Sequence, residues 1–243
     1  MLTAKEVSVA YGRNLALDNV SLSVHAGEML AVVGANGAGK STLASALVGT
    51  AALRSGAVFL DGKDISRAST TARVSRGVTL VPEGRHLFPM MSVEENLRVG
   101  ATHGHSSRPV DERISDVLRL FPRLGERLNQ TAATMSGGEQ QMVAIGRGLM
   151  ADPSVLILDE PTLGLSPLMV TKTFEALATL RSQGLSILLL EQNLRQSLAV
   201  ADRGVVLERG RPRLEGSGQE LLHDESLVAA YFGTSSQGHT SKR

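Results

Sequence analysis

Cysteine and tryptophan are absent from this chain of 243 residues, and its aromatic side chains are limited to five Phe and two Tyr. Without cysteine, the sequence excludes disulfide bonds, thiolate metal sites and catalytic thiols. So few rings cannot form a convincing row of base-stacking side chains. Lys and Arg number 25 against 24 Asp and Glu, a net charge of +1, so no basic excess indicates nucleic acid or an acidic lipid as the partner.

Long apolar runs are missing as well. The strongest, Leu185 to Leu190 and Val155 to Leu158, are much shorter than the roughly 20 residues that cross a bilayer, and they read as strands. The first residues lack the apolar segment of a secretory signal, so we expect no export. The length suits one substantial core, and we expect the polar residues 234–243 to form a disordered tail.

The most informative segment that is present is a glycine-rich loop after the apolar run Leu30 to Val33. It consists of Gly34, Ala35, Asn36, Gly37, Ala38, Gly39, Lys40, Ser41 and Thr42, and we predict that these residues bind a nucleoside triphosphate. The glycines let backbone N–H groups surround phosphates at a helix N-terminus. Lys40 would balance the charge of the β- and γ-phosphates, and Ser41 would place its hydroxyl on Mg²⁺. A coincidental glycine-rich turn is disfavoured, because the loop lies between a strand and a helix.

A pair of carboxylates follows another apolar run, Val155 to Leu158. Asp159 and Glu160 would lie at the carboxyl end of a buried strand, where open α/β sheets bind ligands. We predict that Asp159 helps to hold Mg²⁺ and that Glu160 polarises the attacking water. An exposed acidic turn is the alternative, and the phosphate loop makes it the minor one.

A third motif, Ser136, Gly137, Gly138 and Glu139, begins a helix. Ser136 and Glu139 have the spacing of a capping box, so a well-capped helix is the simplest interpretation. However, two glycines in the first turn cost roughly 1 kcal/mol each relative to Ala, which indicates that something must approach the backbone. A γ-phosphate fits, because free N–H groups and the positive end of the helix dipole attract an anion.

Short apolar runs recur between segments of helical periodicity, which predicts an α/β fold with a largely parallel, buried sheet. These runs are Leu30 to Val33, Val78 to Val81, Val155 to Leu158, Ile187 to Leu190 and Val205 to Leu207. Near the N-terminus, strand-forming residues are separated by Gly and Asp turns instead, which predicts a small antiparallel sheet beside the core. They occupy Leu2 to Val9, Val20 to Val24 and Ala57 to Leu60.

Residues 92–150 have a helical pattern. Ser92 and Glu95 have capping-box spacing, and Pro122 is expected to end a helix. The apolar face of that helix contains Ile114, Val117, Leu118 and Phe121. We therefore expect a helical subdomain at about 92–150, inserted into a core of residues 1–91 and 151–233. Ser166 and Pro167 predict the N-cap and first turn of a further helix.

Together these motifs resemble the ATP-binding cassette (ABC) family, from about Leu2 to Gly233. The resemblance implies the ABC ATPase fold: a RecA-like P-loop NTPase core, a small antiparallel β-subdomain and an inserted α-helical subdomain. It also implies that each ATP lies between the phosphate loop of one subunit and the Ser-Gly-Gly signature of another, in a homodimer or a heterodimer with a second ABC ATPase. By the same resemblance Tyr11 stacks on adenine, an ordinary surface or core tyrosine being the alternative.

Four further strings are similar to LivF-type subunits of branched-chain amino acid importers. They are Val81 to Arg85, Ser92 to Leu97, Leu163 to Pro167 and Leu190 to Asn193. This similarity implies ATP-driven uptake in bacteria with two membrane permease subunits and, indirectly, a solute-binding protein. The ATPase would then be peripheral, on the cytoplasmic face of the inner membrane. Residues 87–94 could grip a permease helix, although core packing is about as plausible for each of them.

Three positions depart from the general cassette pattern. Glu83 stands where most cassettes have Gln, and we predict that it still contacts Mg²⁺. Gln192 stands where most have His, and we give it a catalytic role as an uncharged hydrogen-bond donor to the γ-phosphate. Ser166 replaces an Asp that bridges the dimer in many cassettes. We therefore expect the two composite sites of a heterodimer to be unequal, with the site built on Lys40 and Glu160 still hydrolysing ATP but more slowly.

Other readings remain open. An exporter ATPase, for example one that extracts lipid, shares every catalytic motif. DNA-associated ATPases share them too, but the insertion here lacks heptads and cysteine, so nucleic acid is disfavoured. A pure binding module is opposed by Lys40, Asp159 and Glu160. His103 and His105 without a third ligand do not indicate a transition metal. The sequence does not decide which solute is transported, and branched-chain amino acids, amides and urea are all compatible with it.

Overall fold

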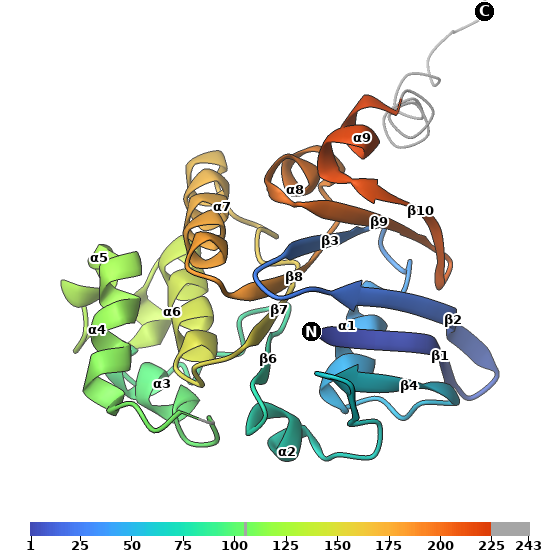
Figure 1. The fold of residues 1–243 in the computed structure, drawn as a ribbon. Helices are drawn as coiled ribbons and strands as arrows, with labels where there is room; N and C mark the ends of the chain where they lie inside the picture. Colours follow the sequence, from blue (N-terminus) through green and yellow to red (C-terminus); the bar gives the residue numbers. More distant parts are fainter. Residues whose placement is uncertain (105, 225–243) are drawn as a thin grey trace, which may run out of the picture.

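The computed structural model describes residues 1–104 and 106–224 (Figure 1). The expected tail at 234–243, the end of the expected domain at 225–233 and His105 lie outside the described residues. Two sheets and the helices packed on them make up the described part. In Figure 1 the antiparallel sheet lies on one side of the larger sheet and a group of helices on the other.

The larger sheet has six strands and is parallel except at one edge. Its order is β10 (Arg211–Ser217), β9 (Arg203–Glu208), β3 (Met29–Val33), β8 (Ser186–Glu191), β7 (Val155–Asp159) and β6 (Val78–Val81). Only β10 runs antiparallel to its neighbour. Every residue of β3, β7 and β8 is buried, which confirms the expected two-sided core.

The antiparallel sheet has the order β2 (Asn14–Val24), β1 (Leu2–Tyr11), β4 (Ser55–Leu60) and β5 (Lys63–Asp64). Its inward side chains, α1 (Lys40–Val48) and one face of the larger sheet form a single apolar cluster. Leu43 and Leu47 of α1 are fully buried in it. The cluster therefore fixes α1, and with it the end of the phosphate loop, against both sheets. The short α2 (Thr70–Val74) precedes β6.

Helices occupy the chain between β6 and β7. They are α3 (Val93–Gly100), α4 (Val110–Leu120), α5 (Pro122–Gly125), the 3₁₀ helix η1 (Ala132–Thr134) and α6 (Gly137–Leu149). The Ser92 capping box is present, with Glu95 N–H bonded to the Ser92 hydroxyl at 3.2 Å and Ser92 N–H bonded to the Glu95 carboxylate at 2.7 Å. Pro122 ends α4 as expected and also begins α5, because its fixed φ suits a first helical position.

Three further helices cover the C-terminal half: α7 (Pro167–Ser182), α8 (Leu194–Val200) and α9 (Gly218–His223). Ser166 is the N-cap of α7 as expected, but its hydroxyl makes no capping hydrogen bond. A second apolar cluster joins α6 and α7 to the other face of the sheet. Within the described ranges, no helix combines the length and the apolar character that crossing a membrane requires.

Candidate functional site

The phosphate loop leaves the sheet at the end of β3 and enters α1 at Lys40. Gly39, the N-cap of α1, has a φ of 109°, and a Cβ atom there would lie 2.9 Å from the Ala16 carbonyl oxygen. A Cβ atom at Gly34 would lie 2.5 Å from the Leu207 carbonyl oxygen. Both positions therefore need glycine. The loop brings its backbone to a helix N-terminus, as phosphate binding requires.

Lys40 is buried, with 4% of its surface exposed. Its Nζ donates hydrogen bonds to the carbonyl oxygens of Gly34 at 2.7 Å and Ala35 at 3.2 Å, and lies 3.0 Å from Glu160 Oε1. These three acceptors hold the ammonium group beside the loop. Because hydrogen bonds between an ammonium group and phosphate oxygens are charge-assisted, a triphosphate can compete with them.

Two carboxylates lie at the same edge of the sheet, because β3, β8 and β7 are parallel neighbours: Asp159 is the last residue of β7, and Glu160 follows it. Asp159 is 5% exposed, and its Oδ1 has no hydrogen-bond partner among the described residues. Burial raises the pKa of Asp159, while the Ser41 side chain and the charge of Lys40 oppose this change. Glu160 has a φ of 47°, and its N–H donates to the Leu190 carbonyl at 2.9 Å, which fixes the turn after the strand.

A cavity of about 490 Å³ opens beside these groups, within the roughly 300–1,000 Å³ of small-molecule sites. Eight of the residues predicted to bind ATP or Mg²⁺ or to catalyse hydrolysis line this cavity: Asn36, Gly37, Gly39, Lys40, Ser41, Thr42, Glu83 and Glu160. Leu163, from the string Leu163 to Pro167, also lines it, and residues that belong to no motif complete it: Asn14, Leu15, Ala16 and Arg209. The cavity thus combines a cation, backbone donors and carboxylates in one place.

Several predicted residues are not part of this lining. Gly34, Ala35 and Ala38 of the phosphate loop and the buried Asp159 are outside it, and so are three further predicted groups. Tyr11 ends β1 with 56% of its surface exposed, and its register partner Asn14 lines the cavity. Gln192 follows β8 and is exposed, and its N–H donates to Glu191 at 3.2 Å. Residues 136–139 begin α6, with the expected capping box. The roles predicted for these groups toward ATP remain predictions.

Glu191 is a buried carboxyl group that the sequence reasoning did not single out. It is 2% exposed, and its Oε1 accepts hydrogen bonds from the Thr162 hydroxyl at 2.6 Å and the Thr162 N–H at 3.0 Å. Its carbonyl oxygen accepts from the Gly34 N–H at 3.3 Å. Burial raises the pKa of Glu191, and the bonds from Thr162 act in the opposite direction. Glu191 therefore ties the phosphate loop to the loop after Glu160.

The groups predicted to hold Mg²⁺ fit a hard divalent cation. The buried Oδ1 of Asp159 lacks a partner, which a cation would supply. Ser41 and Glu83 are exposed and both line the cavity next to Glu160. Oxygen ligands of this kind are the ones that Mg²⁺ prefers.

We expect Asp159→Asn to raise the thermal stability of the ligand-free chain at neutral pH, although it removes a predicted Mg²⁺ ligand. Burial raises the folded-state pKa of Asp159, so stability falls as the pH rises from the unfolded-state pKa, about 3.9, to the folded-state value. The loss persists at pH 7, and Asn avoids it.

Thermal unfolding at pH 7 and pH 4 measures this effect. A gain of about 1 kcal/mol would raise Tm by roughly 2–4 °C at pH 7, and the gain should shrink at pH 4. A variant with a lower Tm than the parent at pH 7 would show that the Asp159 carboxylate stabilises the fold.

Comparison with known sequences identifies the family of this chain. A family model described as ABC transporter matches residues 17–163. The branched-chain amino acid transport ATP-binding protein BraG of Pseudomonas aeruginosa is 43% identical, over 96% of this chain and 100% of its own. A probable LivF of Archaeoglobus fulgidus is 36% identical, over 96% and 99%. The lipopolysaccharide export protein LptB of Escherichia coli K12 is 32% identical, over 96% and 97%.

Solved structures agree with the fold. A nucleotide-free ATP-binding cassette from an ABC transporter has a TM-score of 0.86 and 27% identity, covering 96% of this chain and 99% of that one. The cassette MJ1267 in its ADP conformation has a TM-score of 0.85 and 27% identity, with 96% and 98% covered. The chain therefore belongs to the ABC transporter family, as an ATP-binding cassette that hydrolyses ATP.

Proposed function

We propose that this cassette drives the import of branched-chain amino acids or related solutes. The similarity to BraG, at 43% identity over essentially both full lengths, is the observation that carries the proposal. The exporter relative LptB is less similar, at 32%. Amides and urea belong to the same range of candidate solutes.

In the proposed mechanism, the triphosphate of ATP takes Lys40 away from Glu160. The freed Glu160 carboxylate accepts a proton from the attacking water as its oxygen bonds to the γ-phosphorus and the bond to ADP breaks. Mg²⁺ held by Ser41, Asp159 and Glu83 would supply positive charge to the β- and γ-phosphates. The 3.0 Å contact between Lys40 and Glu160 supports a coupling between ATP binding and release of the base.

We assign Tyr11 to adenine and Gln192 to the γ-phosphate. The signature residues 136–139 serve the ATP of a second ABC ATPase subunit, in a homodimer or a heterodimer. Two observations favour this division: the signature is not part of the cavity around Lys40, and Ser136 is exposed at the start of α6. Glu83, Gln192 and Ser166 differ from the usual cassette residues, so we propose that in the heterodimer the two composite sites hydrolyse ATP at unequal rates.

We propose that the partners of the assembled transporter include two membrane permeases. On this chain, a permease helix would dock in a groove between β6 and the helices α3 and α6. Apolar side chains in its lining include Val74, Leu80, Val81, Pro82, Phe88 and Val99. Phe88 is 45% exposed, and Met90, nearby in the chain, is 85% exposed. Arg147 of α6 donates hydrogen bonds to the carbonyl oxygens of Arg85 and His86, and its guanidinium group lies 5.8 Å from the centre of the Phe88 ring. A helix docked here would therefore contact residues linked both to α6 and to the loop that contains Glu83.

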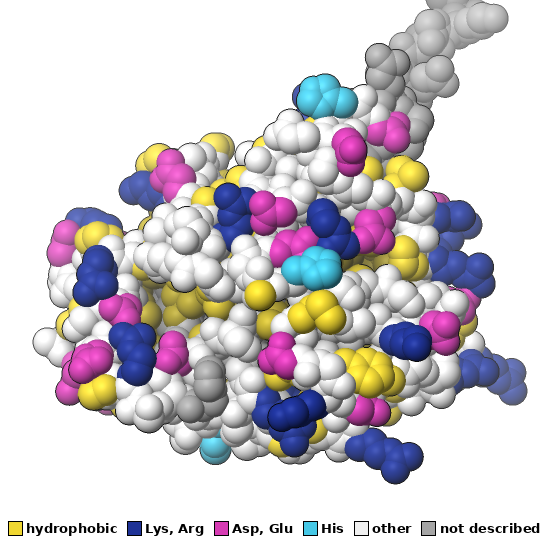
Figure 2. Space-filling model, viewed as in Figure 1, with side chains coloured by type: hydrophobic (Ala, Val, Ile, Leu, Met, Phe, Trp, Pro, Cys, Tyr) yellow, Lys and Arg dark blue, Asp and Glu magenta, His cyan; other side chains and the backbone are white. Residues whose placement is uncertain are grey.

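Docking on permeases would make the chain a peripheral protein on the cytoplasmic face of the bacterial inner membrane. A solute-binding protein would act on the other side, without contact to this chain. On the face shown in Figure 2, Lys and Arg side chains are interspersed with Asp and Glu. This mixture, with the net charge of +1, favours protein partners over nucleic acid.

We expect Phe88→Ser to weaken association with the permeases while the ATPase activity of the separated cassette stays within about twofold. An aromatic anchor at an interface commonly contributes about 2 kcal/mol, or about 30-fold in affinity. The backbone bond from Phe88 N–H to Asn96 Oδ1 is independent of the side chain, so the loop should keep its conformation.

Co-purification with the permeases measures this loss. Leu214→Ser is the matched control, because Leu214 is 39% exposed on β10, outside the residues that line the groove. If both variants recover the permeases equally well, Phe88 is not part of the docking surface.

Transport by reconstituted vesicles tests the function itself. Vesicles that contain this cassette, its ATPase partner, the permeases and the solute-binding protein should accumulate labelled leucine only with ATP, and isoleucine or valine should compete. Permease-stimulated ATP hydrolysis without uptake of any of these solutes would contradict the solute assignment. Extraction of lipid under the same conditions would establish export instead.

A further inference from the structure

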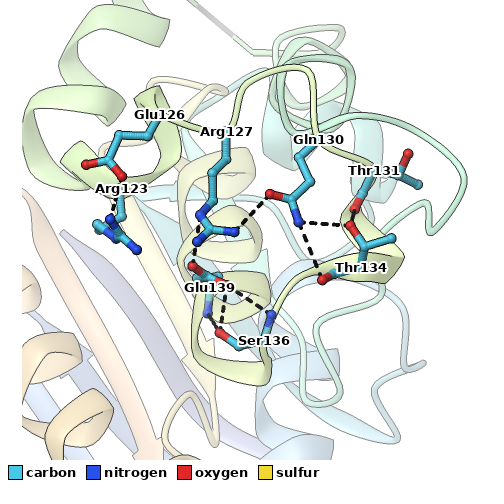
Figure 3. Close-up of polar contacts among 8 residues, drawn as sticks. All are labelled: Arg123, Glu126, Arg127, Gln130, Thr131, Thr134, Ser136 and Glu139. Carbon is cyan, nitrogen blue, oxygen red and sulfur yellow. Dashed lines mark hydrogen bonds and ion pairs between the residues drawn. The ribbon is translucent and has the colours of Figure 1, made fainter.

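The N-terminus of α6 carries an acidic side chain where the proposed signature must receive a phosphate. The Glu139 Oε2 atom accepts hydrogen bonds from the Ser136 hydroxyl at 2.8 Å and the Ser136 N–H at 3.0 Å (Figure 3). These bonds lower the pKa of Glu139, so its carboxylate is ionised at neutral pH. An ionised carboxylate beside Ser136 repels an incoming γ-phosphate.

Arg127 supplies the opposite charge from the segment that follows α5. Its Nε lies 3.2 Å from Glu139 Oε1, the oxygen that Ser136 does not use (Figure 3). The charge of Arg127 also contributes to the lowered pKa of Glu139. The carboxylate is therefore held by Ser136 through one oxygen and neutralised by Arg127 through the other.

The Arg127 side chain is itself oriented by neighbours. Its Nη1 donates to Gln130 Oε1 at 2.9 Å, and Gln130 Nε2 donates to the Thr134 hydroxyl at 2.9 Å. The Thr134 hydroxyl in turn donates to the Thr131 carbonyl at 2.8 Å (Figure 3). This chain of bonds fixes the guanidinium group before any ligand arrives, so the signature does not have to reorganise it.

A purely structural role accounts poorly for this arrangement. The capping box already holds Glu139, and it needs no cation. The ion pair is partly exposed, with 32% of the Arg127 side chain and 16% of the Glu139 side chain accessible, and such pairs contribute little to folding stability. A charge next to a bound phosphate, in contrast, changes the affinity for that phosphate directly.

We propose that Arg127 is a positioning residue of the signature. It neutralises the Glu139 carboxylate, so that the backbone N–H groups at Gly137 and Gly138 can donate hydrogen bonds to the γ-phosphate of an ATP bound by the second subunit. This inference rests on the proposed composite site. Arg85, whose Nη1 donates to Gln140 Oε1 at 3.1 Å, is a second cation at the start of α6, so losing Arg127 weakens the site without abolishing it.

Steady-state ATP hydrolysis by the assembled transporter tests the inference, together with nucleotide binding to the separated chain. In Arg127→Gln, the KM for ATP should rise about tenfold with little change in kcat, and more at low salt, where repulsion is less screened. Binding of a fluorescent ATP analogue to the separated chain should not change, because the phosphate loop is intact. Adding Glu139→Gln should return KM to within about twofold of the parent, since Gln keeps the capping box and removes the charge.

Arg123→Gln is the matched control. Arg123 lies in α5 and pairs with Glu126 at 2.5 Å (Figure 3). Its charge lowers the pKa of Glu139 less than that of Arg127 does, so its loss should leave KM within about twofold. An unchanged KM in Arg127→Gln, or a raised KM that Glu139→Gln does not lower, overturns the inference. A parent transporter that binds ATP but does not hydrolyse it would overturn the proposed composite site itself. The failure of that proposal can therefore be told apart from the failure of the inference about Arg127.

Discussion

Glu160→Gln is expected to lower ATP turnover about 10²- to 10⁴-fold while ATP still binds. Gln has nearly the same shape but cannot accept a proton from the attacking water, and this range is typical for loss of a general base. We expect the side chain to lie close to the phosphates of a bound ATP, because Glu160 Oε1 lies 3.0 Å from Lys40 Nζ and Glu160 lines the same cavity. Removing the Glu160 charge also frees Lys40, so ATP affinity should be equal or higher.

Turnover and ATP affinity should be measured on the assembled transporter, with Glu175→Gln as the control. Glu175 is exposed on α7, outside the cavity, and its replacement should leave both quantities within about twofold. Undiminished turnover in Glu160→Gln would remove Glu160 from the catalytic role and assign the hydrolytic step to another group.

Lys40→Met is expected to weaken ATP binding by roughly 2–4 kcal/mol, which is about 30- to 700-fold in Kd. The substitution removes the buried ammonium group that would bind the β- and γ-phosphates, and it leaves the Glu160 carboxylate without its partner. An unpaired carboxylate next to the phosphates adds repulsion to the lost attraction. Met keeps the length of the apolar stem, so α1 should still pack between the sheets.

Isothermal titration with ATP and Mg²⁺ measures this loss, and Lys172→Met is the control. Lys172 is exposed on α7, and its replacement should leave Kd within about twofold. If the Lys40 variant folds and binds ATP as tightly as the parent, the phosphate loop does not act through its lysine.

The phosphate loop and the pair Asp159 and Glu160 could be predicted because each lies at the end of an apolar strand. In a parallel sheet, that position alone brings distant motifs to one edge. The capping box at Ser136 could be predicted for a similar reason, since it depends on residues three apart. All three features could be recognised from residues that are close together in the sequence.

Arg209 and the segment Asn14 to Ala16 could not be predicted as cavity lining. Arg209 reaches the site because β9 pairs with β3, and residues 14–16 reach it because β2 folds back on β1. Such pairings join residues far apart in the sequence, and no local pattern records them. Glu191 was not predicted for another reason: a carboxyl group directly after an apolar run gives no sign that Thr162, distant in the sequence, will bind it.

Light scattering of the Glu160→Gln chain, with and without ATP, tests the central claim that each chain holds halves of two different ATP sites. The parent mass is 25.7 kDa, and ATP should about double the observed mass, either for the chain alone or after addition of its ATPase partner. ADP should not have this effect, because it lacks the γ-phosphate that we propose the signature binds. A particle of single-chain mass whose parent form hydrolyses ATP at the full rate, independent of protein concentration and of any partner, would contradict the account.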